Sequence, residues 1–303
     1  MISKRPLRPA SMSGYFIALI TSQTISIKTT VKNGVDMLGS TLINRIKTIL
    51  NDPIIGLYHV YFKLGIMPTK KIKNKALASI PVYCINLPSA KERRAFMLEQ
   101  VDRTEFSNFQ FVEGINGAEL NVESLTRDGL YDDATAKKYH GRPLRLGEIA
   151  LSLSHGKIYD QVVANNQKMA LILEDDAIFV TNRINSIDIA SFPANWDIIF
   201  LSSALSHYPP NGKIKGNLYN TESWRASAAA YLVSLSGAAK LASTYKPTCH
   251  AADGFIGRNI DYPDNKAHDF KQVGARCKLN ASLVYPDCML NGSCLGFSAS
   301  TIR

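Results

Sequence analysis

The sequence predicts an α/β protein with a mostly parallel sheet, helices on both faces of that sheet, and a basic helical segment ahead of it. Three observations support this prediction. Short apolar runs alternate with helical patterns, 46% of the 303 residues are hydrophobic, and all of the excess positive charge lies in the first quarter of the chain. A chain of this length and composition can bury one large core or two modest ones.

Six runs have the length and composition of buried strands. The first, SIPVYCINL at 79–87, is followed by a tight turn and by the helical pattern AKERRAFMLEQV at 90–101. Further helical patterns begin near Gly147 and after Ser236. Alternation of strands and helices favours a mainly parallel sheet. The other five runs are FQFV (109–112), MALIL (169–173), WDIIFL (196–201), AAAYLVS (228–234) and ASLVYP (281–286).

The charge balance and the apolar pattern both change at residue 79. This change divides the chain into a basic amphipathic extension, 1–78, and a larger domain, 79–303. The extension holds 12 Lys and Arg against two acids, whereas the remainder holds 23 of each sign. Apolar residues between 35 and 49 recur at helical spacing. Two interpretations stay open: a peripheral membrane anchor whose lysines meet anionic lipid at about 1 kcal/mol each, or a helical hairpin packed on the larger domain.

The cysteines and the early apolar run bear on the compartment. Five cysteines, odd in number and without a C-x-x-C spacing, argue against a disulfide framework or a zinc knuckle and favour a reducing compartment. The run YFIALI at 15–20 is too short to span a membrane, and no small-residue cleavage site of a signal peptide follows it.

Three consecutive acids in ALILEDDAIF follow a predicted strand. In open α/β sheets, ligands bind outside the carboxyl ends of the strands. Because side chains alternate in an extended chain, Glu174 and Asp176 can share a face while Asp175 points away. Two carboxylates at a partly dry strand end repel each other, and a Mg²⁺ or Mn²⁺ ion resolves that conflict. A solvated turn is the alternative.

A polar stripe occurs in the helical pattern that begins near Gly147. Glu148, Ser152 and His155 share one face of this helix. The stripe suits the wall of a ligand pocket, and an ordinary hydrogen-bonding pair is the alternative.

A second polar group surrounds the first predicted strand. Asn86 closes the strand, and Arg93 and Arg94 lie in the first turns of the next helix, where backbone N–H groups favour an anion such as a diphosphate. Two solvated arginines are the alternative. No glycine-rich fingerprint or P-loop follows the strand, which disfavours a Rossmann dehydrogenase or a P-loop kinase.

Taken together in order, these segments resemble glycosyltransferase family 25 from about residue 80 to the C-terminus. That family contains bacterial lipooligosaccharide galactosyltransferases and animal collagen β-galactosyltransferases. The resemblance implies a GT-A fold, a UDP-sugar donor, usually UDP-galactose, a Mn²⁺ or Mg²⁺ ion at the acidic motif, and inversion at the anomeric carbon. The similar segments are VYCINLPSAKERRAFM, YHGRPLRLGEIALSLSHGKIYDQVV, ALILEDDAIF, WDIIFL and AAYLVSLSGAAKLA.

The resemblance also implies roles for individual residues. Asp253, in CHAADGFIG, matches the acid that would accept a proton, although Ala251 and Ala252 stand where the family often has Pro-Val. Residues 1–78 have no counterpart in the family pattern. Metal ligands would be Glu174 and Asp176 of the E-D-D motif; donor-binding residues would be Asp175, Asn86, Arg93 and Arg94 of the N-L…R-R opening, and Glu148, Ser154 and His155 of the G-E…S-H helix.

We therefore predict an inverting transferase that moves galactose from a UDP-sugar to a lipooligosaccharide or lipopolysaccharide core acceptor. The acceptor is expected between Asp253 and the polar loop at 203–222, with Tyr208, Tyr219 and Trp224 available for stacking on sugars. The expected location is the cytoplasm, peripheral on the inner face of a bacterial inner membrane. Two alternatives are a metal-dependent phosphohydrolase and a non-catalytic membrane-surface protein. Nucleic acid is disfavoured as a partner because the basic segment contains no recognisable reading module.

Overall fold

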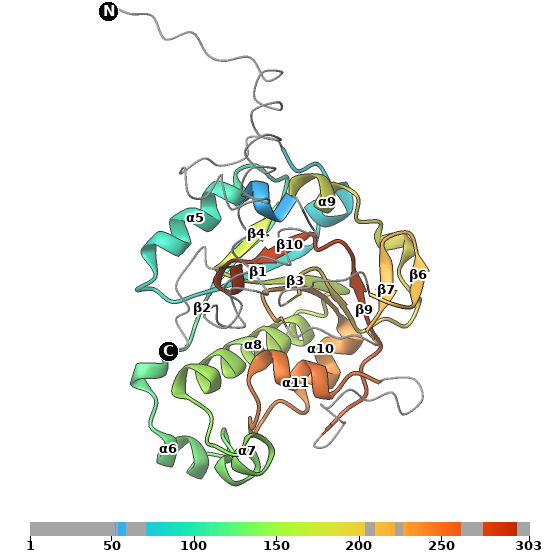
Figure 1. The fold of residues 1–303 in the computed structure, drawn as a ribbon. Helices are drawn as coiled ribbons and strands as arrows, with labels where there is room; N and C mark the ends of the chain where they lie inside the picture. The colour runs from blue at the N-terminus through green and yellow to red at the C-terminus, as the bar shows by residue number, and fades with distance from the viewer. Residues whose placement is uncertain are drawn as a thin grey trace, which may run out of the picture.

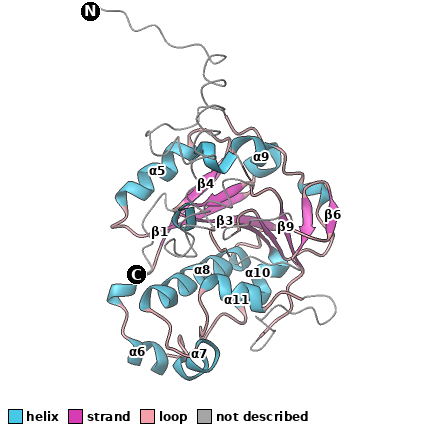
Figure 2. Ribbon diagram, in the orientation of Figure 1, coloured by secondary structure: helices cyan, strands magenta, loops and turns pink. Residues whose placement is uncertain are grey.

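The structure is a computed structural model that describes residues 52, 54–58, 71–203, 210–221, 227–261 and 275–295. Within these residues, an eight-stranded sheet forms the centre of the molecule and a small two-stranded sheet lies beside it (Figures 1 and 2). The large sheet has the order β2 (Asn108–Glu113), β1 (Pro81–Asn86), β3 (Met169–Glu174), β8 (Ala230–Ser234), β5 (Ile198–Phe200), β9 (Ala281–Val284), β7 (Leu218–Asn220) and β6 (Lys213–Lys215). The small sheet pairs β4 (Ala177–Phe179) with β10 (Met289–Asn291).

The predicted α/β architecture with a mostly parallel sheet is confirmed. Strand β1 pairs in parallel with both β2 and β3, and β5 pairs in parallel with β9. Strand β8 runs against its neighbours β3 and β5, and β7 runs against β9 and β6. All six predicted strand runs form strands of the large sheet. The range 203–222, expected to be a loop, contains the short strands β6 and β7.

Helices cover both faces of the large sheet, as predicted. In Figure 1, α5 and α9 lie above the sheet, and α8, α10 and α11 lie below it. Short helices complete the described chain. The helices are α4 (Lys75–Ala78), α5 (Lys91–Val101), α6 (Val122–Arg127), α7 (Asp133–His140), α8 (Leu146–Ala164), α9 (Thr181–Asn185), α10 (Leu235–Ala242), α11 (Ala252–Arg258) and α12 (Gly292–Leu295), with 3-10 turns η2 (Gly117–Glu119) and η3 (Ile189–Ser191).

The strand sequences account for this layering. In β3, Ala170 and Ile172 belong to the apolar cluster under α8, whereas Leu171 and Leu173 belong to the cluster on the opposite face. A strand that is buried on both faces reads as a continuous apolar run, because every side chain meets a layer of helices. The carboxyl end of β3 is thereby fixed in the middle of the molecule, and the acid triplet begins there.

The described parts of the predicted extension pack on the larger domain. Ile72 and Leu77 are buried in the apolar cluster above the sheet. The side chain of Asn74 caps α4 and donates hydrogen bonds to the carbonyl oxygens of Ile184 and Ile187, at 2.8 and 2.9 Å. Contacts therefore cross the boundary expected at residue 79. The helical pattern predicted at 35–49 lies outside the described residues.

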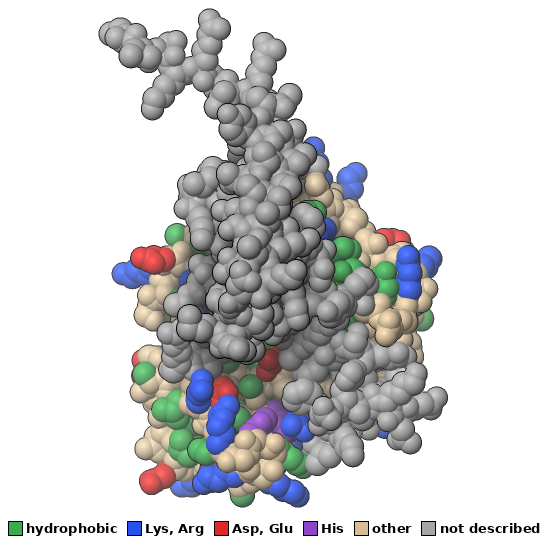
Figure 3. Space-filling view, viewed as in Figure 1, with side chains coloured by type: hydrophobic (Ala, Val, Ile, Leu, Met, Phe, Trp, Pro, Cys, Tyr) green, Lys and Arg blue, Asp and Glu red, His purple; other side chains and the backbone are tan. Residues whose placement is uncertain are grey.

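No helix within the described residues is long and apolar enough to cross a lipid bilayer. On the face shown in Figure 3, both basic and acidic side chains occur across the described surface. This mixture agrees with the balanced charge of residues 79–303.

A buried carboxyl group, that of Asp287, lies between β9 and β10 and makes the stability of the fold depend on pH. Asp287 is 8% exposed and accepts hydrogen bonds from the backbone N–H and the hydroxyl of Ser203. Burial raises the pKa of Asp287 to about 7. The folded protein therefore holds a proton that the unfolded chain releases near pH 4, so this stabilisation is complete below about pH 4 and is lost as the pH rises through 7.

We expect Asp287→Asn to remove that dependence, because the amide oxygen can still accept from Ser203 and carries no charge. Between pH 5 and pH 8, the wild type should lose roughly 2.5 kcal/mol more of its free energy of unfolding than the variant loses. Urea unfolding of both proteins at the two pH values measures the difference. Parallel pH profiles would show that Asp287 is ionised in the folded protein at pH 5.

Candidate active site

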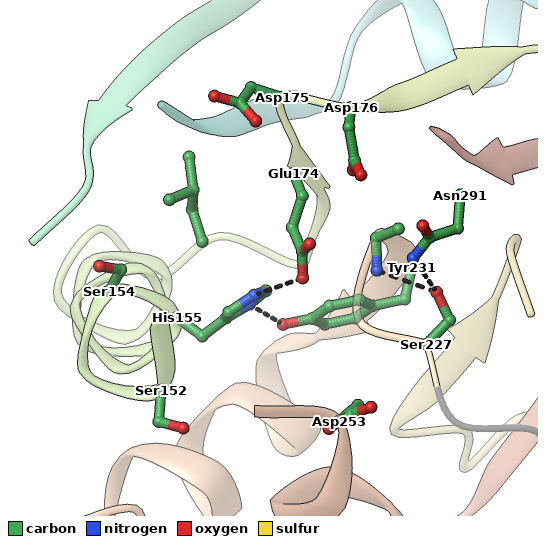
Figure 4. Close-up of polar contacts among 12 residues, drawn as sticks. Ser152, Ser154, His155, Glu174, Asp175, Asp176, Ser227, Tyr231, Asp253 and Asn291 are labelled. Carbon is green, nitrogen blue, oxygen red and sulfur yellow. Dashed lines mark hydrogen bonds and ion pairs between the residues drawn. The ribbon is translucent and has the colours of Figure 1, made fainter. Parts of the chain in front are cut away.

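The acid triplet lies where β3 ends and the chain turns into β4. Glu174 is the last residue of β3, and Asp175 and Asp176 form the turn. Strict alternation of side chains stops at this turn, so the neighbours of each acid, and not the pleat, decide its direction. Figure 4 shows Asp175 pointing away from the other two acids, and Glu174 pointing toward His155.

Asp175 is held by residues of β1 and α5, the strand and helix whose polar residues were predicted from the sequence to bind an anion such as a diphosphate. Arg93, from α5, contacts Asp175 Oδ1 through Nη1 at 2.6 Å, and Asn86, from the end of β1, donates to Oδ2 at 2.8 Å. Burial raises the pKa of Asp175, and the charge of Arg93 and the hydrogen bond from Asn86 oppose that shift. Asp175 therefore orients the guanidinium of Arg93.

Asp176 is 3% exposed and is fixed from the far end of the chain. The backbone N–H of Ser293 donates to Asp176 Oδ2 at 2.9 Å, and the Ser293 hydroxyl donates to the same oxygen. The other oxygen, Oδ1, is buried and has no hydrogen-bond partner among the described residues. A buried carboxylate oxygen without a partner is costly, so this atom marks a place for a cation or a donor group.

Glu174 is the third acid, and it ends a buried polar chain. Its Oε1 lies 3.4 Å from His155 Nε2, and His155 Nδ1 lies 2.8 Å from the Tyr231 hydroxyl (Figure 4). The Tyr231 hydroxyl in turn lies 2.8 Å from the Tyr159 hydroxyl. Burial lowers the pKa of His155 to about 3, so its imidazole is neutral. Burial, reinforced by the charges of Asp176, Asp253 and Asp175, raises the pKa of Glu174 well above its usual range.

All three acids border one pocket of about 410 Å³ at the carboxyl end of the sheet. This size suits a small-molecule ligand. Its far wall is the loop after β2, which is joined to α8 by a 2.9 Å hydrogen bond from the Ile115 N–H to the Ser154 hydroxyl. The pocket is lined by Ile85, Leu87, Arg93, Gly114, Ile115, Asn116, Gly117, Ala118, Arg145, Leu146, Gly147, Ala150, Leu151, Ser154, Glu174, Asp175, Asp176 and Ser293.

The side chains at this pocket fit a hard divalent cation that would take its remaining ligands from water and from a bound phosphate group. Within the described chain, no three His, Cys, Asp or Glu side chains are grouped as ligands of one ion. Mg²⁺ characteristically takes one or two protein carboxylates and completes its shell with water and substrate phosphates. Asp176 Oδ1, which no described residue contacts through a hydrogen bond, suits such an ion. Glu174 supplies a second carboxylate at the same pocket, while Asp175 is already paired with Arg93.

Comparison with known proteins decides the family. The model of glycosyltransferase family 25, described as LPS biosynthesis proteins, matches residues 79–256. The chain belongs to glycosyltransferase family 25. One relative, procollagen galactosyltransferase 1-B of Xenopus laevis, is 31% identical to this chain over 188 residues. These residues cover 57% of this chain and 29% of that protein. A family 25 member of Aedes aegypti is 29% identical over 177 residues, covering 56% and 29%.

Family membership alone does not establish catalysis, because the relatives include proteins named as inactive. The inactive family member 3 of Homo sapiens is 32% identical over 130 residues, which cover 40% of this chain and 21% of that protein. This family 25 chain spans less than a third of the length of each of these relatives. A solved structure of a glycosyltransferase involved in glycosylation of the major capsid of PBCV-1 aligns with a TM-score of 0.31 and 13% identity, covering 55% of this chain and 66% of that one.

Not every motif residue of the family 25 chain reaches the pocket. Arg94 is exposed, and its guanidinium lies 3.9 Å from the centre of the Phe111 ring. Glu148 caps α8: its carboxylate accepts from the Arg145 N–H at 2.7 Å and pairs with Arg142 at 2.7 Å. The predicted polar stripe therefore does not act as one group. Glu148 caps the helix, whereas His155 contacts Glu174 of the acid triplet.

Asp253 lies in the first turn of α11, apart from the residues that line the pocket. In Figure 4 it lies below the His155–Tyr231 pair, with Asp175 and Asp176 above that pair. Burial raises the pKa of Asp253, and its charge contributes to raising the pKa of Glu174. Asp253 therefore lies close enough to Glu174 to influence its pKa, but it belongs to α11 and not to the lining of the pocket.

Of the three aromatic residues expected to contact the acceptor, the structure describes Tyr219, and it lies away from this site. Tyr219 lies in β7, which is four strands away from β3 in the sheet, or roughly 19 Å at ordinary strand spacing. Tyr208 and Trp224 lie outside the described residues.

Sequence reasoning missed three residues of this site. Tyr159 follows His155 by one helical turn, and Tyr231 is a hydroxyl-bearing residue inside an apolar strand, so spacing and burial could have indicated both. Ser293 is 117 residues from Asp176 in the chain, and no local pattern connects them.

Proposed function

We propose that the chain is an inverting glycosyltransferase that transfers galactose from UDP-galactose to a hydroxyl group of a lipopolysaccharide core acceptor. One observation carries the proposal: a fixed cation, Arg93, and a buried carboxylate oxygen that has no partner among the described residues, Asp176 Oδ1, border the same pocket at the carboxyl end of β3. A sugar nucleotide with its divalent ion satisfies both, because the diphosphate complements Arg93 and the ion complements Asp176.

Galactose is chosen as the sugar because relatives bear the name procollagen galactosyltransferase. The lipopolysaccharide acceptor rests on the description of the matching family. The reducing compartment indicated by the cysteines suits a cytoplasmic site of synthesis, peripheral on the inner face of a bacterial inner membrane.

In the proposed reaction, the donor diphosphate binds at Arg93, which Asp175 holds in place while Asn86 donates to the other oxygen of Asp175. Asp176, together with Glu174, would hold Mn²⁺ or Mg²⁺, and the bound ion would supply positive charge for the departing UDP. Ser154 supports the wall of the pocket, and His155 fixes the carboxylate of Glu174.

The chemistry is a single displacement at the anomeric carbon. The acceptor oxygen forms a bond to this carbon as the bond to the UDP oxygen breaks, and the electron pair leaves with UDP. Asp253 lies outside the lining of the donor pocket, so the acceptor would have to approach from the side of α11 for Asp253 to accept the proton of its hydroxyl. Attack from the face opposite the leaving group inverts the anomeric configuration.

The test is a panel of UDP-sugars with and without Mn²⁺, offered with heptose-type and lactose-type acceptors. We expect one hexose to be added to the acceptor, with UDP-galactose as the preferred donor, only when the metal is present, and with an inverted anomeric centre by NMR. Mass spectrometry of the acceptor detects the transfer. Release of phosphate without any gain of mass on an acceptor would instead support a phosphohydrolase.

The two neighbouring arginines provide a matched pair of variants. We expect Arg93→Gln to raise the KM for the UDP-sugar roughly 10- to 100-fold, since a hydrogen bond to a charged group contributes about 1.5–3 kcal/mol. Arg94→Gln should leave that KM unchanged, because Arg94 lies on Phe111 outside the pocket. Equal effects of the two substitutions would contradict the placement of the diphosphate.

A further inference from the structure

We propose that β10 and Ser293, with Asp52 and residues 54–58 packed behind them, form a clamp that positions the carboxylate of Asp176 toward the donor pocket. Both parts of this clamp lie outside the family-matched residues 79–256. The inference rests on the proposed function, since it assigns a positioning role at the same site.

Ser293 controls the direction of the Asp176 side chain. Its backbone N–H and its hydroxyl both reach Oδ2, which leaves Oδ1 without a partner in the part of the chain that the structure describes. The same hydroxyl lies 3.1 Å from Asn291 Oδ1, a second acceptor. Two donors on one oxygen restrict the rotation of the carboxylate, which is how residues around a metal ligand orient it.

Close backbone contact fixes Ser293 against the turn. The Gly292 N–H donates to the Asp176 carbonyl oxygen at 3.1 Å. A Cβ atom at Gly292 would lie 2.5 Å from that oxygen, so glycine permits the approach. Strand β10 also pairs with β4 in antiparallel register, with Asn291 opposite Ala177 and Leu290 opposite Ile178. The position of Ser293 is therefore set by the residues that directly follow Asp176.

Residues 54–58 pack on the face of the β4–β10 pair that Ile178 and Leu290 form. Ile55 and Tyr58 are buried in one apolar cluster with Ile178, Val180 and Leu290. A two-stranded sheet alone is marginally stable in water, so this cover supports the β4–β10 pair.

Polar contacts hold the same segment in place. The Tyr58 hydroxyl donates to the Phe179 carbonyl oxygen at 3.0 Å, and Asp52 pairs with Arg183 through two contacts of 2.7 Å. Arg183 also donates to the Asp287 carbonyl oxygen at 3.1 Å, just ahead of β10. The segment is thus joined both to β4 and to the residues that lead into β10.

The test compares Ser293→Ala, which removes one of the two donors, with Ser293→Thr, which keeps the hydroxyl. Mn²⁺ binding in the presence of UDP is measured by calorimetry on the full chain, without acceptor or turnover. We expect Ser293→Ala to raise the Kd for Mn²⁺ roughly 10-fold, as changes beside a metal ligand do, and Ser293→Thr to restore it. Ser243→Ala is the control, because that exposed hydroxyl contacts the Lys240 carbonyl oxygen at the end of α10.

A second variant, Tyr58→Phe, tests the segment behind the strands, since it removes the bond to Phe179 and keeps the ring. We expect a smaller rise in the Kd for Mn²⁺, in the same direction. Wild-type affinity in Ser293→Ala, combined with loss of binding in Asp176→Asn, would overturn the clamp and leave the proposed function standing. Full Mn²⁺ affinity in Asp176→Asn would overturn the metal assignment, and the clamp with it.

Discussion

Asp176→Asn should lower hexose transfer by roughly 1,000-fold, the effect of losing several kcal/mol of charge stabilisation at the leaving group. The substitution keeps the shape of the side chain, and the amide oxygen can still accept both donors of Ser293. It removes the one buried carboxylate oxygen that lacks a partner among the described residues at the pocket. Initial rates at saturating UDP-sugar and Mn²⁺ measure the loss.

The fold should survive this substitution. The charge of Asp176 is one cause of the raised pKa of Glu174, so a neutral side chain relieves repulsion instead of adding it. The melting temperature of Asp176→Asn should therefore be no lower than that of the wild type. Asp128→Asn is the control and should leave the rate unchanged. Asp128 is exposed, pairs with the neighbouring Arg127 and does not line the pocket. Undiminished transfer by Asp176→Asn would disprove the metal assignment.

The layers of the fold could be predicted because burial leaves a strong trace in the sequence. Both faces of β3 meet helices, so MALIL reads as an uninterrupted apolar run, and the acids that follow it mark the point where burial ends. Strand β8 has the same kind of run, yet it is antiparallel to β3 and β5. A strand buried on both faces carries the same pattern in either direction, so composition could not reveal this reversal.

The three-residue strands and the turn after β3 could not be predicted from the sequence, because short or long-range features leave no local pattern. β4, β6, β7 and β10 each have three residues, too few to show alternation. The turn at Asp175 and Asp176 follows from pairing of β4 with β10, which is more than 100 residues away in the chain. Local patterns therefore located the acids but could not show that Asp175 binds Arg93 and that Asp176 meets Ser293.

The role of the basic extension shows the limit of composition. Twelve positive charges made residues 1–78 look like an appendage, yet Ile72 and Leu77 are as buried as the residues of β1. Charge reports which side chains face solvent along a segment, and a few apolar residues are enough to anchor that segment in a core. The membrane-anchor interpretation stays a prediction for the part of the extension before residue 52.

Residues 79–303 alone should fail to fold. Their isolation removes four buried apolar side chains, Ile55, Tyr58, Ile72 and Leu77. At roughly 1.5–3 kcal/mol each, these contribute about 6–12 kcal/mol, which is comparable to the whole stability of an ordinary domain, about 5–15 kcal/mol. The loss of Asn74 adds to this, because it leaves two buried carbonyl groups without their donors. Circular dichroism and urea unfolding of the fragment measure the result.

Residues 52–303 provide the matched comparison, because this fragment keeps every described contact of the extension. We expect it to unfold cooperatively with the midpoint of the full chain and to transfer hexose at the same rate. Sedimentation with anionic vesicles then separates the two interpretations of the extension. If residues before 52 are an anchor, the full chain sediments with the vesicles and the 52–303 fragment stays in solution. A cooperatively folded, active 79–303 fragment would show instead that the packing of the described residues before 79 is dispensable, because the domain would then be stable without it.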